Sequence, residues 1–83
     1  MSNTDIPLSE LGGNLLASRK KMFPGDTQKA FAKRIGVGRA TLQRMEAGDL
    51  TVSIGKYYSA AKVLNLEPAF AALLKPGVSL FDD

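Results

Sequence analysis

Cysteine and histidine are both missing from this chain of 83 residues. The absence of cysteine excludes a disulfide framework, a thiolate metal site and a cysteine nucleophile. The absence of histidine removes the commonest general base and the commonest transition-metal ligand. No two carboxylates are placed to serve as acid and base. We therefore expect a protein that is not an enzyme and that binds no metal, cofactor or small-molecule substrate.

The sequence also lacks an apolar run long enough to span a bilayer. Its amino-terminal residues, MSNTDIPL, contain no lysine or arginine, so we expect no signal peptide there. With the absence of cysteine, these features suit a reducing cytoplasm, so we expect a cytoplasmic protein that does not bind a membrane. A chain of 83 residues forms one small domain with little stability to spare, which a second copy would increase.

Positive charge is scarce outside one segment and concentrated within it. Residues 19–44 contain eight basic residues and one acidic residue, Asp26, so this segment carries +7, while the remainder carries −4 and the whole chain +3. The eight basic residues are Arg19, Lys20, Lys21, Lys29, Lys33, Arg34, Arg39 and Arg44. A phosphate backbone favours such a cluster because neutralised phosphates release condensed counterions. The cluster as a whole indicates nucleic-acid binding, although any single lysine is better explained as a solvated residue on an exposed helix face.

Residues 27–48, TQKAFAKRIGVGRATLQRMEAG, have the pattern of two short helices joined by a glycine-rich turn. In the first helix Phe31, Ala32 and Ile35 share one face, which predicts that this face is buried. The turn is formed by residues 36–38. Gly36 tolerates the left-handed backbone that ends the first helix, Val37 is an apolar residue that can point inward, and Gly38 starts the next helix.

The second helix of this pair has one apolar face and one face suited to contact with DNA. Leu42 and Met45 lie one turn apart and predict the buried face. The outward side chains are those of Arg39, Ala40, Gln43 and Arg44. We interpret this outward face as the part of the chain that meets a DNA groove.

The same segment combines, at fixed spacing, Gln28, Ala32, Gly36, Val37, Leu42 and Met45, followed by Glu46-Ala47-Gly48. This set resembles the helix-turn-helix of the Xre type, the family that includes lambda repressor and Cro, and the resemblance extends over roughly residues 11–74. It implies an all-α fold, a compact five-helix lambda-repressor-like DNA-binding domain. Ala30 stands where the family often has Glu, and Gly38 where Ser commonly caps the recognition helix, so both caps are weakened while the reading surface is intact.

We expect three parts in the chain: a flexible N-terminal tail (1–7), the helix-turn-helix DNA-binding domain (8–75) and a short apolar C-terminal segment (76–83). The first helix is predicted over residues 8–22. Its apolar side carries Leu8, Leu11, Leu15 and Met22. Gly12-Gly13 within it costs about 1 kcal/mol per glycine relative to alanine, and a neighbouring helix that packs close there is favoured over a phosphate that approaches the backbone.

Two further helices are predicted after the paired ones. The fourth begins after the cap residue Ser53 and ends at Asn65. Its inner stripe comprises Ile54, Tyr57 or Tyr58, Ala61 and Leu64. The fifth begins at Glu67-Pro68 and is broken by residues 75–77, Lys-Pro-Gly. Its apolar residues are Phe70, Leu73 and Leu74.

The predicted function is that of a sequence-specific double-stranded DNA-binding regulator, most simply a homodimeric repressor that reads an inverted repeat. The predicted DNA-binding residues are Gln28, Gly38, Arg39, Ala40, Thr41, Gln43 and Arg44. The first turn of the recognition helix faces base edges, and the Arg39 guanidinium can donate hydrogen bonds to both acceptors of one guanine. Gln28 and Thr41 can hold DNA phosphates through their side chains and the nearby backbone amides at helix starts. Arg44 suits either a base or a phosphate.

The resemblance also implies that an arginine late in the first helix pairs with a glutamate that ends the recognition helix. Arg19 and Glu46 occupy those positions. If they pair, Arg19 is structural and does not belong to the DNA-binding patch. The alternative is a free Arg19, with Glu46 opposing the positive field of the patch.

The C-terminal end carries the residues expected at a homodimer surface: Phe70, Leu74, Val78, Leu80 and Phe81. The alternatives are that residues 78–81 fold back onto their own domain or bind another protein. The run GVGRATLQRMEAG, with a compact fifth helix and an apolar tail, also resembles HipB-like antitoxins, which bind their own promoter and a kinase-type toxin. The alternative function is therefore that of an antitoxin with a toxin partner.

Overall fold

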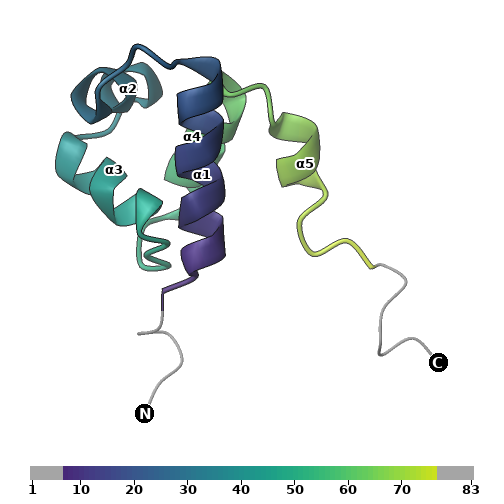
Figure 1. Cartoon of the computed structure of the whole chain (residues 1–83). Coiled ribbons are helices and arrows are strands. Elements are labelled where there is room, and N and C mark those ends of the chain that lie inside the picture. Colours follow the sequence, from purple (N-terminus) through teal and green to yellow (C-terminus); the bar gives the residue numbers. More distant parts are fainter. Residues whose placement is uncertain (1–6, 77–83) are drawn as a thin grey trace.

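The computed structural model describes residues 7–76, and these residues form five α-helices. The helices are α1 (Ser9–Met22), α2 (Gln28–Ile35), α3 (Arg39–Glu46), α4 (Ile54–Val63) and α5 (Glu67–Ala71). Helices α2 and α3 lie on one side of α1 and α4, and α5 lies on the other (Figure 1). The all-α, five-helix prediction is confirmed. Within residues 7–76, no helix has both the length and the apolar character needed to cross a membrane.

The core lies where α2, α3 and α4 meet α1. Phe31, Leu42 and Met45 are fully buried, and Ile35 and Leu15 are nearly so. Each such side chain stabilises the fold by about 1.5–3 kcal/mol relative to an exposed position. The predicted inner faces of α2 and α3 are therefore confirmed, and their burial leaves the opposite face of α3 turned to solvent.

The ends of α2 and α3 follow the local sequence. Thr27 Oγ1 accepts a hydrogen bond from Ala30 N across 3.1 Å and caps α2. Gly36 ends α2 with a left-handed φ of +76°, which favours glycine because it has no Cβ. Gly38 occupies the cap position of α3 and contributes no side-chain bond there, as its sequence predicts. The turn between the two helices is therefore confirmed as a close junction.

Gly12 allows α1 to approach the end of α3. A Cβ added at Gly12 would collide with the backbone of Glu46 and Gly48, whereas one added at Gly13 would meet nothing within 4 Å. Gly48 is similarly constrained, because it has a φ of +79° and its carbonyl accepts a hydrogen bond from Leu8 N at 2.8 Å. The predicted close helix packing is correct for Gly12 and wrong for Gly13.

Three residues predicted for inner faces are exposed. Ile54 is 68% exposed, Leu8 49% and Met22 42%. Each lies at a helix end, where the apolar period continues but the neighbouring helix no longer covers it. Ala60, which the predicted stripe of α4 omitted, is almost fully buried instead. The remainder of that stripe is correct at Ala61 and Leu64.

Helix α5 is shorter than predicted. It ends at Ala71, so Leu73 and Leu74 follow it instead of extending its apolar face. Leu74 has a φ of +63° and is fully exposed. Most of the expected N-terminal tail, most of the C-terminal segment, and the predicted dimer contacts Val78, Leu80 and Phe81 lie outside the described residues.

Candidate nucleic-acid interface

Helix α3 presents the predicted reading residues on its solvent side. Leu42 and Met45 anchor the helix in the core. The exposed residues of its reading face are Gly38, Arg39, Ala40, Gln43 and Arg44. Thr41 is half-buried and lies in the first turn of the helix. The first turn of α3 and the cap residue before it therefore expose an arginine, a small apolar residue and a glycine, and these small residues leave the backbone accessible.

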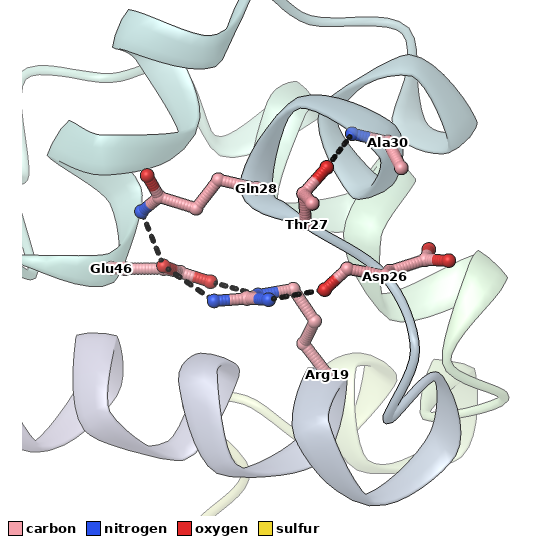
Figure 2. Close-up of polar contacts among 6 residues, drawn as sticks. All are labelled: Arg19, Asp26, Thr27, Gln28, Ala30 and Glu46. Carbon is pink, nitrogen blue, oxygen red and sulfur yellow. Dashed lines mark hydrogen bonds and ion pairs between the residues drawn. The ribbon is translucent and has the colours of Figure 1, made fainter.

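A buried ion pair holds the end of α3 against α1. Arg19 Nε lies 2.6 Å from Glu46 Oε2, and Arg19 Nη2 donates to Glu46 Oε1 across 3.3 Å. Both side chains are 7% exposed. Arg19 Nη1 also donates to the carbonyl of Asp26 at 3.4 Å, so the guanidinium spans from Glu46 to the loop before α2 (Figure 2). Arg19 and Glu46 therefore pair, and Arg19 is not part of the exposed basic surface.

Gln28 is drawn into the same network. Its Nε2 donates a hydrogen bond to Glu46 Oε1 across 2.9 Å, while its amide oxygen points away from Glu46 (Figure 2). Gln28 is half-buried at the first position of α2. One amide hydrogen is thus committed to Glu46, and the second hydrogen of the same group is left to bind another acceptor.

Arg34 is held at the outer end of α2. Its Nε lies 2.6 Å from Asp26 Oδ2, and its guanidinium sits 4.2 Å from the centre of the Phe23 ring. The hydrogen bond from Arg34 holds the pKa of Asp26 below its usual value, and the same bond raises the pKa of Arg34. Arg34 therefore adds little net charge to the surface, because Asp26 neutralises it.

Arg44 is held by the loop that follows α3. Its Nε donates to Asp49 Oδ2 at 2.9 Å and its Nη2 to Thr51 Oγ1 at 2.8 Å. Asp49 also accepts from both the backbone N and the hydroxyl of Thr51. These bonds, led by the Thr51 hydroxyl and followed by Arg44, lower the pKa of Asp49 to about 2. The guanidinium of Arg44 is consequently fixed in direction and partly neutralised.

Asp49 and Thr51 are site residues that the sequence analysis missed. An Asp two residues before a Thr, directly after the glycine that ends a helix, is a signal for a local turn closed by the carboxylate. The loop conformation is further fixed by Tyr57, whose hydroxyl donates to the Asp49 carbonyl at 2.7 Å.

The remaining basic residues of the segment stay exposed. They are Lys20, Lys21, Lys29, Lys33 and Arg39, and none forms an ion pair with another residue in the range 7–76. Three arginines of the original eight basic residues are paired with carboxylates. The exposed charge is therefore smaller than the count predicts, and Arg39 is the unpaired cation on the reading face of α3.

Comparison with known proteins gives one finding that bears on this surface. A family model described as "Helix-turn-helix" matches residues 25–70, which is more than half of the chain. No curated protein and no solved structure matches the chain. The matched segment begins in the turn before α2 and ends in α5, so it contains the whole candidate interface.

Proposed function

The chain belongs to the Xre or lambda repressor-like helix-turn-helix family of DNA-binding transcriptional regulators, and we propose that it is a homodimeric, sequence-specific repressor. The observation that carries the proposal is the position of Arg39, exposed and unpaired among residues 7–76 at the amino end of α3. A recognition helix inserted in the major groove places this end nearest the base edges.

Each predicted reading residue has a defined role in this proposal. Arg39 binds the two acceptors of one guanine, and Gln43, one turn later, is within reach of the next base pair. Ala40 has no polar side-chain atom, so it contacts a thymine methyl or leaves space for one. Arg44, fixed by Asp49, extends to a phosphate at the groove edge. Gln28, Thr41 and the backbone at Gly38 position the helix on the DNA backbone.

The homodimer supplies the rest of the specificity. One helix reads only a few base pairs, so two copies related by a twofold axis would read an inverted repeat with half-sites about 10 base pairs apart. The proposed contact surface is the C-terminal end, with Phe70, Leu74, Val78, Leu80 and Phe81. Leu73 and Leu74 are both exposed at this end, so the described part of the C-terminal end offers adjacent apolar side chains to a partner.

A HipB-like antitoxin is the second proposal. Leu73 and Leu74 are 53% and 101% exposed, and such apolar residues suit a protein partner. Copurification of the chain with the product of its neighbouring gene tests this. A kinase-like protein that copurifies in fixed ratio supports an antitoxin, and a product that does not bind leaves the repressor function alone.

Selection of bound duplexes from a random library tests the main proposal. We expect enrichment of an inverted repeat whose half-sites are separated by about one helical turn. Affinity for the selected duplex should fall steeply as salt rises, because phosphate contacts release counterions. Enrichment of a sequence without an inverted repeat contradicts the homodimer, and enrichment of no sequence at all contradicts sequence-specific binding.

A further inference from the structure

An apolar groove separates α5 from the surface formed by α1 and α4. One hollow of this groove has a volume of about 190 Å³ and includes Leu11, Leu15, Leu64 and Phe70 in its walls. A second hollow of about 240 Å³ shares Leu11, Tyr57, Phe70 and Leu73 with the first and continues to Leu50 and Ile54. The two hollows therefore adjoin each other across these four shared side chains, and we call the pair the groove.

The described residues leave this groove open. Leu73 is 53% exposed, Ile54 68% and Leu50 50%, although all three belong to its walls. Apolar surface in contact with water costs about 25 cal/mol per Å², so an apolar segment that fills the groove would be stabilised. Ile54, which was predicted on an inner face, borders this groove, so a segment that fills the groove would cover the part of Ile54 that no neighbouring helix reaches.

The chain carries a suitable segment directly beyond the described residues. Val78, Leu80 and Phe81 form a short apolar run bounded by Gly77 on one side and two aspartates on the other. Leu73, which borders both hollows, precedes this run by only five residues. The run and the groove are thus both apolar, and the aspartates that follow the run favour solvent.

The course of the chain after α5 indicates which groove the run reaches. From Leu74, with its left-handed backbone, the described chain continues down and away from α1 (Figure 1). At its last described residues the chain therefore heads away from α1 (Figure 1), and a return of the run to its own groove requires a turn at or after Pro76-Gly77. In a dimer related by a twofold axis, the run of each copy would enter the groove of the other copy, so that both grooves are filled at once.

We propose that residues 78–81 of one copy fill the groove between α1, α4 and α5 of a second copy, and that the exchange is reciprocal. The proposal rests on the homodimer proposed above and specifies its interface. Phe70 acts in it as a wall of the groove, whereas Val78, Leu80 and Phe81 are the side chains that enter.

Cross-linking between single-cysteine variants tests the exchange, because the natural chain has no cysteine. Ser18→Cys places a thiol in the groove wall, and Ser79→Cys places one in the entering run without removing an apolar residue. The two variants, one carrying a size tag, are mixed and treated with a short bismaleimide. This cross-linker joins two nearby thiols whether or not their side chains point directly at each other. We expect the mixed cross-linked pair as the main product. Ala17→Cys, exposed on the adjacent position of α1 and outside the groove, should give little of it.

The outcomes separate this proposal from the homodimer itself. The exchange is overturned if the mixed product does not exceed the Ala17→Cys level. It is also overturned if a double Ser18→Cys/Ser79→Cys chain cross-links mainly within one copy at a concentration at which sedimentation shows the dimer. Sedimentation of Leu80→Asp/Phe81→Asp, with helicity checked by circular dichroism, gives a second readout. We expect loss of the dimer. A dimer that persists in this variant overturns the exchange but retains the homodimer, whereas a monomeric natural chain overturns both.

Discussion

Gln28, the first residue of α2, donates a hydrogen bond from its side-chain amide to Glu46 Oε1, which joins it to the last residue of α3. The same carboxylate is paired with Arg19 of α1. Glu46 therefore receives donors from two helices and fixes the end of α3 against both. The direction in which α3 projects from the domain depends on a charged group that is itself hidden from solvent.

Replacement of Glu46 by alanine should lower the free energy of unfolding by about 3–5 kcal/mol, because it leaves the charge of Arg19 buried without a partner. A domain of this size has about 5–15 kcal/mol in total, so the variant should be close to unfolding. Urea denaturation at neutral pH measures the change. The double variant Arg19→Met/Glu46→Met should be more stable than Glu46→Ala, since it leaves no unpaired charge. Equal stability of the two would show that the pair is not responsible.

Two adjacent glycines of α1 should respond in opposite directions to alanine. Gly12→Ala should destabilise the fold by at least about 1–3 kcal/mol, because the new Cβ meets the backbone of Glu46 and Gly48, which cannot rotate away. Gly13→Ala has free space and should stabilise the helix by about 0.5–1 kcal/mol. The difference between their thermal midpoints measures the close approach of α1 to α3. A Gly12→Ala variant as stable as Gly13→Ala would contradict that packing.

The buried faces were predictable from sequence because helical spacing is a local property. Phe31, Leu42 and Met45 each have a place in a pattern of three or four residues, and the turn residue Gly36 has its own conformational signature. The exposure of Ile54 was not predictable in this way. Periodicity gives the direction of a side chain from its helix, but it does not reveal whether a neighbouring element extends far enough to cover it.

The charges of the site show the same limit. The charges of residues 19–44 sum to a strongly positive value. In the structure, however, Arg34 pairs with Asp26, and Arg44 pairs with Asp49, which lies outside that segment. These pairs depend on where a loop turns after a helix ends. The pairing of Arg19 with Glu46, 27 residues apart, was expected only from family resemblance. Family knowledge therefore supplied the long-range contact, while the sequence left the loop contacts open.

Acid should weaken the fold through Asp26 and Asp49. Both have a pKa below the usual 3.8, and that of Asp49 is about 2. A carboxylate whose folded pKa is lowered contributes stability that is fully present above its unfolded pKa and is lost as pH falls through the folded value. The urea midpoint should therefore decrease between about pH 4 and pH 2. Asp26→Asn/Asp49→Asn should show a flatter decrease over this window. An unchanged slope in the double variant would assign the acid sensitivity to other carboxylates.

The assignment of Arg39 as a base-reading residue makes a prediction that charge alone does not. Arg39→Lys keeps the positive charge but loses the planar fork that binds two acceptors of one guanine. Its affinity for the selected duplex should fall by about 1–3 kcal/mol, while affinity for random duplex is nearly retained. Arg39→Ala should weaken binding to both duplexes. The slope of affinity against salt concentration should decrease by about one phosphate contact only if the guanidinium of Arg39 touches the DNA backbone. Titrations of both variants against both duplexes at several salt concentrations separate these roles. If Arg39→Lys binds the selected duplex as tightly as the natural chain, Arg39 contributes charge and not recognition, and α3 must read its site through Gln43.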